Sequence, residues 1–204
     1  SAPRCTSMSG SAYVIATAST DEKRAACLEE GADYAIDYRE GLRDKVKELT
    51  GARDGVDIVY DPIGAEVFDE SLRCLAWGGR ILVDATNPIA PGLAGLSLGT
   101  STSGAEELAR LATHARVVKA FNTTGFENMA DPEYAQGRIF MPVCGDDADA
   151  RSRIVALVIS LGFDGVDAGP LMAARYLEPF AMTWIQLAYR QGFGRKFAFS
   201  IIRR

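Results

Sequence analysis

Short apolar runs alternate with polar, helix-like segments along the first part of the chain. The runs at residues 12–17, 34–38 and 56–60 have the length of buried strands, and each is followed by residues typical of a turn or a helix start. Residues 22–30 and 39–50 carry apolar residues at helical spacing among charged ones. Strands and helices that alternate in this way predict parallel strands joined by right-handed crossovers, which is an α/β fold.

The stretch from residue 78 to 88, Gly-Gly-Arg-Ile-Leu-Val-Asp-Ala-Thr-Asn-Pro, is the clearest strand of the chain. Two glycines end the helix that we expect over residues 65–76, and an apolar run of strand length follows. Asp84 to Asn87 then place polar groups where a parallel strand stops. The pattern predicts a central strand with a functional polar tip.

The second half continues the alternation with longer loops. A Gly-, Ser- and Thr-rich loop from Pro88 to Ser103 is too long for a simple connector, which makes it a candidate lid or binding loop. We expect a polar loop at residues 122–137. The further strands are expected at residues 116–121, 138–144 and 163–167, and the further helices at residues 105–113 and 147–161.

Residues 171–204 differ from the alternating part of the chain. Apolar residues recur there at helical spacing, with Pro179, Gly192 and Gly194 as interruptions, which predicts a kinked or broken terminal helix. We therefore expect two parts, an α/β domain over residues 1–170 and a terminal helical segment. That segment has more apolar bulk than a helix on a complete sheet needs, which favours a homodimer through it. The bulky residues are Tyr176, Leu177, Phe180, Trp184, Leu187, Phe193, Phe197, Phe199 and Ile201.

Composition excludes several classes of function. The net charge of -5 without long basic runs argues against nucleic-acid binding, because phosphate binding needs clustered Lys and Arg. The four cysteines lack paired ligand spacing, which favours free thiols over disulfides or a zinc site. No apolar run approaches the roughly 20 residues of a membrane span, and residues 1–10 lack the order of a signal peptide. We expect a cytoplasmic protein that contacts neither nucleic acid nor membrane.

Candidate acid-base and metal groups are few. Asp146 and Asp147 fit a helix N-terminus, where acidic residues favour the macrodipole. His114, the only histidine, has no acid-base partner nearby in sequence. The sequence therefore predicts no catalytic side chain and no metal ligand, and small-molecule cofactors are the expected partners.

Residues 12–83 resemble the cofactor domain of medium-chain NADPH quinone oxidoreductases. The resemblance lies in Tyr-Val-Ile-Ala-Thr-Ala-Ser-Thr-Asp-Glu-Lys, Gly-Ala-Asp-Tyr-Ala-Ile-Asp-Tyr-Arg-Glu and Gly-Val-Asp-Ile-Val-Tyr-Asp-Pro-Ile-Gly. It implies that Ser19, Lys23 and Tyr38 surround the adenosine 2′-phosphate of NADP. Separately, the hydroxyl-rich turn from Thr17 to Thr20 could hold a phosphate at a helix N-terminus in place of a glycine-rich turn. The alternative is an ordinary helix cap followed by a solvated lysine.

Residues 80–204 are similar to the NADPH-dependent reductases of the deazaflavin coenzyme F-420. Four blocks carry this similarity in order: Asp-Ala-Thr-Asn-Pro from residue 84, Val-Lys-Ala-Phe-Asn-Thr from residue 118, Val-Cys-Gly-Asp-Asp from residue 143 and Asp-Ala-Gly-Pro from residue 167. The similarity implies direct hydride transfer between nicotinamide and deazaflavin rings. It places Asn87, Pro88, Asn122 and Thr123 at strand tips facing those rings. The alternative is that both asparagines only cap turns.

One shared feature of the two families is missing. Both begin their nucleotide domain with a strand and a Gly-rich turn that approaches the pyrophosphate, whereas these 204 residues contain no G-x-G-x-x-G. We expect a Rossmann-like, doubly wound parallel sheet that lacks the usual first strand. If the other strands close up, the order becomes the flavodoxin-like 2-1-3-4-5, with residues 12–17 between residues 34–38 and 56–60.

Three functions follow from these patterns. The leading one is an NADP-linked oxidoreductase scaffold of the deazaflavin-reductase type, with cofactor affinity weakened by the missing turn. The second is an engineered or remnant Rossmann-like chimera without catalytic activity, with its seam near residues 78–88. The third is a flavodoxin-like protein that binds flavin mononucleotide or another phosphate ligand at the turn of residues 17–21.

Overall fold

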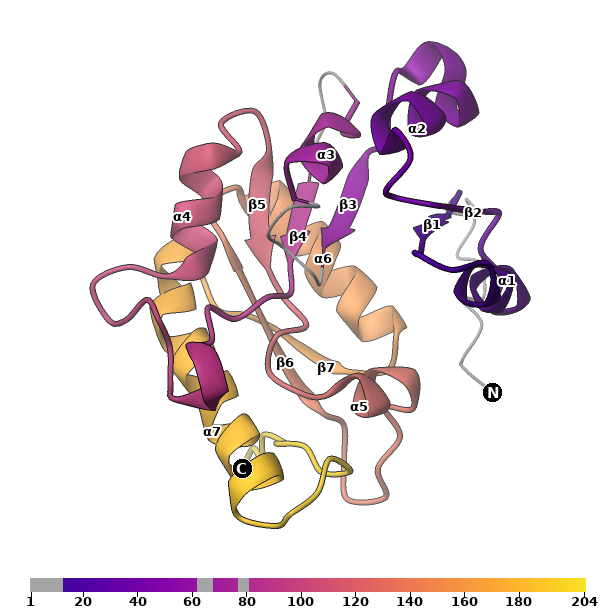
Figure 1. The fold of residues 1–204 in the computed structure, drawn as a ribbon. Helices are drawn as coiled ribbons and strands as arrows, with labels where there is room; N and C mark the ends of the chain where they lie inside the picture. The colour runs from indigo at the N-terminus through magenta and orange to yellow at the C-terminus, as the bar shows by residue number, and fades with distance from the viewer. Residues whose placement is uncertain (1–12, 62–67, 77–80) are drawn as a thin grey trace. The chain divides into compact units, whose positions relative to one another are not determined.

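The computed structural model describes residues 13–61, 68–76 and 81–204, which form α-helices and β-strands in alternation (Figure 1). The chain divides into two compact units, with residues 1–59 and 63–80 in unit 1 and residues 60–62 and 81–204 in unit 2. The main division between the units, at residues 80 and 81, thus falls within residues 78–88, where we placed the seam between the two family resemblances. Residues 78–80 of this stretch lie outside the described residues.

Unit 1 contains a small parallel sheet and its crossover helix. Strand β1 (Ile15–Thr17) pairs with β2 (Tyr34–Ile36), and helix α1 (Asp21–Glu29) connects them. The other elements that begin in this unit are α2 (Leu42–Thr50), the single turn η1 (Gly51–Arg53), β3 (Ile58–Asp61) and α3 (Phe68–Arg73). The small core of the unit consists of the buried residues Leu42, Val46 and Cys74, with Ile15, Ile36, Tyr38 and Val56 packed against them.

Unit 2 is built on a larger sheet whose described strands follow sequence order, β3-β4-β5-β6-β7. Strand β4 (Ile81–Asp84) is parallel to β5 (Arg116–Lys119), and β6 (Phe140–Gly145) is parallel to β7 (Asp164–Asp167). Strands β5 and β6 are antiparallel. The helical elements of the unit are η3 (Pro91–Leu93), α4 (Gly104–Leu111), α5 (Phe126–Ala130), α6 (Ala148–Ser160), η4 (Leu171–Ala173) and α7 (Ala174–Arg190).

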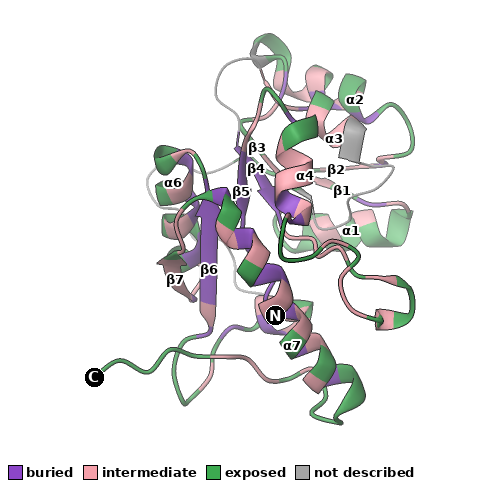
Figure 2. Ribbon diagram, turned by 90° about the vertical axis from the view of Figure 1, so that its left-hand side faces the viewer, coloured by how far each residue is buried: buried purple, intermediate pink, exposed green. Residues whose placement is uncertain are grey.

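Helices cover both faces of the unit 2 sheet. Helix α6 lies on one face and helices α4 and α7 lie on the other (Figures 1 and 2). All four residues of β4 and most of β6 are buried, as central strands between two helical layers must be (Figure 2). The core of the unit is made by Ile81, Val83, Val118, Ala120, Phe121, Ile139, Met141, Val143, Ala150, Ile154, Val158 and Phe163.

The predicted α/β class, with a parallel sheet and a C-terminal helix, is confirmed, except that β5 and β6 pair antiparallel where a parallel pair was expected. The flavodoxin-like strand order is wrong for the described strands, because β1 pairs with β2 in a two-stranded sheet, whereas β3 belongs to the five-stranded sheet. A central strand needs cover on both faces. The residues of β1 are only half-buried or exposed, and the neighbouring Tyr13 and Val14 are exposed.

Two further expectations need correction. The loop predicted at residues 122–137 contains the short helix α5. The terminal helix does not break at Pro179 and ends at Arg190, and residues 191–204 follow as irregular chain. Gly192 and Gly194 have φ angles of +74° and +71°, which a helix cannot accept, so the helix stops before them. Among the helices of the described residues, none has the length and hydrophobicity that a membrane crossing requires.

Candidate functional site

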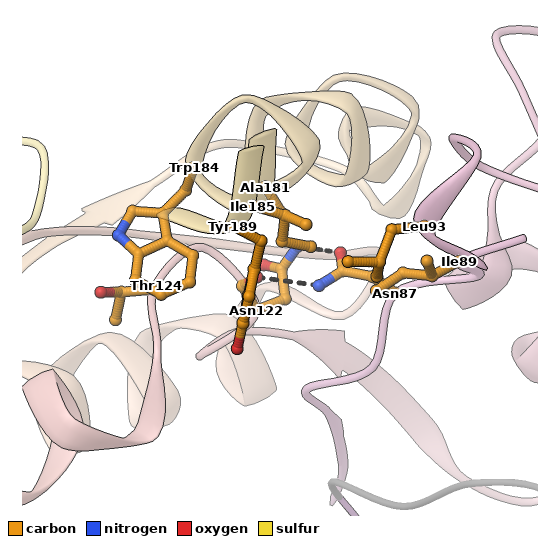
Figure 3. Close-up of a pocket in the computed structure, with 9 residues that line it drawn as sticks. All are labelled: Asn87, Ile89, Leu93, Asn122, Thr124, Ala181, Trp184, Ile185 and Tyr189. Carbon is orange, nitrogen blue, oxygen red and sulfur yellow. Dashed lines mark hydrogen bonds between the residues drawn. The ribbon is translucent and has the colours of Figure 1, made fainter. Parts of the chain in front are cut away.

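Unit 2 contains a pocket of about 340 Å³ on the side of the sheet that α7 covers (Figure 3). Its volume is within the range of roughly 300–1,000 Å³ that ligand pockets have. Three segments form the walls, namely the loop after β4, the loop after β5 and one face of α7. The lining residues are Asn87, Ile89, Leu93, Asn122, Thr124, Ala181, Trp184, Ile185 and Tyr189.

The pocket lies at the carboxyl ends of two parallel strands. Asn87 comes three residues after the end of β4 and Asn122 three residues after the end of β5, and these strands are hydrogen-bonded neighbours. Parallel neighbours end at the same edge of a sheet, so both asparagines are brought to one place. Ligands of open α/β sheets bind at such an edge.

Two hydrogen bonds join Asn87 and Asn122 (Figure 3). Asn87 Nδ2 donates to the Asn122 main-chain oxygen at 2.9 Å, and Asn122 Nδ2 donates to Asn87 Oδ1 at 3.0 Å. Asn122 Nδ2 also donates to the main-chain oxygen of Leu177 in α7 at 3.4 Å. The pair therefore links both strand ends to the helix that forms the opposite wall of the pocket.

Strained backbone precedes and faces this pair. Phe121 has a φ of +62° and Leu93 a φ of +56°, although both are non-glycine residues. Each such conformation costs on the order of 1–3 kcal/mol and persists only where the surroundings fix it. The ring of Phe121 is held by edge contacts to Tyr60 and Phe163. The left-handed turn at Phe121 immediately precedes Asn122, so it directs the chain at this end of the pocket.

The loop after β4 is folded on itself. Ser97 N donates to the Pro88 main-chain oxygen at 2.7 Å, and Ile89 forms an antiparallel bridge with Leu96. Arg190, at the end of α7, donates to the main-chain oxygens of Gly92 and Leu93 at 3.1 and 3.0 Å. The loop that carries Ile89 and Leu93 is thus fastened to the helix on the other side of the pocket.

Residues 191–204 support the α7 wall from outside. Trp184 Nε1 donates to the Phe197 main-chain oxygen at 2.8 Å, and the two rings stack with centroids 5.2 Å apart. Arg195 pairs with Glu127 at 2.7 Å and lies over the ring of Phe126. The aromatic wall of the pocket is therefore held in place by the segment that follows α7.

A buried ionic network lies on the same strands as the asparagines. Lys119 Nζ contacts Asp84 Oδ2 at 2.7 Å, Glu178 Oε1 at 2.8 Å and the Thr86 main-chain oxygen at 2.7 Å. All three ionic side chains are fully buried. Sequence reasoning missed this network, although a lysine inside the apolar run Val-Val-Lys-Ala was a signal that it needed buried acceptors.

Glu178 also holds the start of α4. Its carboxylate accepts from the main-chain N–H groups of Gly104 at 2.9 Å and Ala105 at 3.2 Å. These are unpaired donors of the first helical turn, where a negative charge is favoured. The network therefore ties β4, β5, α4 and α7 together beneath the pocket walls.

The structure places the remaining predicted residues of unit 2 beside the pocket rather than in its lining. Thr123 is buried and its Oγ1 lies 3.8 Å from Met141 Sδ, whereas its neighbour Thr124 lines the pocket. Pro88 packs close to Gly104 and uses its carbonyl to close the loop after β4. Of the four strand-tip residues, the two asparagines line the pocket.

The predicted residues of unit 1 lie around the turn between β1 and α1. Thr20 is the N-cap of α1, and its Oγ1 accepts from Lys23 N at 3.3 Å. The Lys23 side chain is exposed and forms no ion pair with any described residue. The Ser19 carbonyl accepts from Arg39, and the ring of Tyr38 packs against the unit 1 core. Ser19, Thr20 and Lys23 share one turn, whereas Tyr38 is partly used for packing.

Asp37 organises the arginines of this turn. Its carboxylate accepts from Arg39 Nε at 3.0 Å, from Arg39 Nη2 at 2.7 Å and from Arg24 Nη1 at 3.1 Å. The hydrogen bonds from Arg39, supported by the charge of Arg24, hold the pKa of Asp37 well below its usual range. Asp37 therefore stays ionised and positions both guanidinium groups. Nothing in the sequence pattern marked this residue.

The buried thiols are inert. Burial raises the pKa of Cys74 to about 11 and that of Cys144 to about 12. A thiol needs a lowered pKa to act as a nucleophile near neutral pH. Over the described ranges, no group of three His, Cys, Asp or Glu side chains could hold a metal ion.

Comparison with known proteins identifies similarities to oxidoreductases. Residues 4–103 match the family model described as zinc-binding dehydrogenase. The mouse quinone oxidoreductase-like protein 2 is 48% identical over 73 residues, which are 35% of this chain and 21% of that protein. The rat metalloreductase STEAP3 is 28% identical over 179 residues, which are 85% of this chain and 32% of that protein. The chain thus spans well under half the length of these relatives.

A solved structure extends the similarity to nearly the whole chain. It is a putative F420-dependent NADP reductase from Arthrobacter sp. FB24, with 26% identity and a TM-score of 0.66 over 94% of this chain and 99% of that one. The described residues offer no zinc site, so the zinc in the name of the matching family has no counterpart among them. The two resemblances inferred from the sequence are confirmed, and in both parts the chain is similar to oxidoreductases.

Proposed function

We propose that the chain is an NADP-linked oxidoreductase scaffold that transfers hydride between a nicotinamide and a deazaflavin. The observation that carries this proposal is the pocket at the carboxyl ends of β4 and β5, with two joined asparagines on one wall and aromatic residues on another. It is supported by the similarity to a putative F420-dependent NADP reductase. When bound, the two rings supply the hydride donor and acceptor themselves.

The residues of this chain contribute positioning and exclusion of water. Ile89, Leu93, Trp184 and Ile185 give the pocket apolar walls, which favour a flat ring and displace solvent from its faces. The joined amides of Asn87 and Asn122 offer polar groups at a fixed place. When hydride passes directly between two cofactors, the protein contributes mainly by holding the two rings close together and in the correct orientation.

We assign the adenosine 2′-phosphate of NADP to Ser19, Lys23 and Tyr38, and a further phosphate contact to the turn that contains Thr20. Lys23 is exposed and has no ion-pair partner among the described residues, so it suits a phosphate together with the first N–H groups of α1. Because residues 1–204 contain no G-x-G-x-x-G turn, we propose that they hold the pyrophosphate weakly. We also propose a homodimer through the segment of residues 171–204.

The test is turnover of NADPH with an oxidised deazaflavin, followed by absorbance, together with the shift in melting temperature caused by each cofactor at millimolar concentration. Even a weak ligand stabilises a protein when it is far above its dissociation constant. Turnover supports the proposal. If the cofactors raise the melting temperature but no turnover occurs, the protein binds these cofactors without catalysing hydride transfer. If neither effect is seen, the proposed function is wrong.

A further inference from the structure

The orientation of both pocket amides is fixed by main-chain carbonyls. The Asn122 main-chain oxygen can only accept, so the group of Asn87 that meets it at 2.9 Å is the Nδ2 donor. The Leu177 main-chain oxygen likewise requires Asn122 to turn its Nδ2 toward α7 and toward Asn87 Oδ1. Both N–H groups of Asn122 are therefore used.

This orientation leaves one polar atom without a partner. Asn122 Oδ1 is buried and accepts no hydrogen bond from any described residue. The whole residue is only 4% exposed, although it lines the pocket. Leaving a buried acceptor unpaired is costly, so native structures rarely keep one without a use.

We propose that Asn122 Oδ1 accepts a hydrogen bond from an amide or imide N–H of the ligand, and that the pocket selects a flat heterocycle carrying a carboxamide or an imide. Asn87 is then a positioning residue, because its amide is consumed in holding Asn122. The inference rests on the proposed function, since both of its cofactors carry this chemistry: nicotinamide has a carboxamide and deazaflavin an imide.

The chemistry of the pocket makes the selection one-sided. A carbonyl oxygen offered by the ligand meets another acceptor at Asn122 Oδ1 and gains nothing there. The neighbouring apolar residues Leu93 and Ile185 cannot replace the missing donor. Because Oδ1 itself has almost no exposed surface, a donor reaches it only when the side chains around it shift slightly, which favours the thin edge of a planar ring.

The test compares ligands that differ in the donor. Nicotinamide mononucleotide is titrated into the whole chain beside 3-acetylpyridine mononucleotide, in which a methyl ketone replaces the carboxamide. A second pair is 5-deazariboflavin and its N3-methyl derivative, which lacks the imide N–H. We expect the parent of at least one pair to bind about tenfold or more tightly than its partner, as measured by titration calorimetry.

The outcomes separate the two sources of the donor. Discrimination within the first pair assigns the pocket to the nicotinamide, and discrimination within the second assigns it to the deazaflavin. Equal binding within both pairs, or no binding of any of the four at millimolar concentration, overturns the inference. Discrimination without turnover would retain this inference and remove hydride transfer, whereas turnover without discrimination would do the reverse.

A substitution locates the effect. In Asn122→Leu we expect the parent ligand to fall to the affinity of its analogue, so that the ratio within the pair approaches one. Gln186→Leu removes an exposed amide of α7 outside the pocket and keeps the ratio. A folded Asn122→Leu protein that still discriminates overturns the inference. If this variant does not fold, the ligand pairs on the unaltered chain still decide it.

Discussion

Lys119 Nζ lies 2.8 Å from Glu178 Oε1, and neither side chain is more than 1% exposed. A second carboxylate, Asp84, contacts the same ammonium group at 2.7 Å. The surplus negative charge is offset by the main-chain N–H groups at the start of α4. One buried cation thus fixes the relation of two strands and two helices around the pocket.

We expect Lys119→Met to lower the free energy of unfolding by about 3–5 kcal/mol, because it leaves two carboxylates buried without their cation. Urea denaturation followed by circular dichroism measures the change. The matched control is Arg153→Met, which breaks an exposed pair with Asp149 and is expected to cost less than about 1 kcal/mol. Equal effects in the two variants would show that the network does not stabilise the fold.

The sequence pattern identified these strands but not their chemistry. The periodicity marked residues 116–121 as a strand, and β5 covers Arg116–Lys119. It could not show that Lys119 meets Asp84 and Glu178, since that depends on the register of β4 with β5 and on the packing of α7. Hydrophobic patterns report which face is buried, and they do not report which partners a buried charge finds.

The candidate site was predictable to a similar extent. Asn87 and Asn122 follow parallel strands, so their meeting at one sheet edge could be expected. The pocket walls from Leu93, Trp184 and Tyr189 were not predicted, because they depend on a left-handed loop and on the position of α7. The predicted order of the first strands was wrong for a similar reason. An apolar run such as Val-Ile-Ala predicts a strand but does not specify which strands pair with it.

We expect protonation of Asp37 to lower the free energy of unfolding of unit 1 at acidic pH. Its pKa is lowered in the folded state by the hydrogen bonds from Arg39, so its contribution is complete above the ordinary carboxyl pKa of about 4. The contribution is lost progressively as the pH falls below that value. Urea midpoints measured between pH 7 and pH 3 should decline more in the unaltered chain than in Asp37→Asn. Parallel curves would contradict this assignment.

Gly55→Ala is expected to destabilise unit 1 by about 3 kcal/mol or more. A Cβ atom at Gly55 would lie 2.5 Å from the Cys74 main-chain oxygen and 2.6 Å from Ala76 N, and the φ of +143° is itself unfavourable for alanine. The bridge between Val56 and Leu75 would have to open. Gly99→Ala, where the added methyl group meets open space, is the control for thermal denaturation. A Gly55 variant as stable as this control would refute the close approach.

Arg190→Met should loosen the loop after β4 with little change in global stability. The substitution removes the hydrogen bonds to the carbonyls of Gly92 and Leu93, which lie at the surface and contribute about 1 kcal/mol or less each. Hydrogen exchange should accelerate at the amides of Ala90 and Ser97, which close the loop. Arg110→Met removes an exposed ion pair elsewhere and should leave these amides unchanged.

The proposed homodimer depends on the aromatic residues that the terminal segment leaves exposed. Leu177 and Trp184 are buried within unit 2, whereas Tyr176 and Phe193 are 70% and 63% exposed. Substituting both exposed residues by lysine places two unpaired charges in the interface, so light scattering should change from twice the mass of one chain to a single mass. Leu111→Lys, at an equally exposed apolar position in α4, should remain dimeric. If the unaltered chain is monomeric at micromolar concentrations, the homodimer proposal is wrong. If the doubly substituted chain remains a dimer, the interface lies outside residues 171–204.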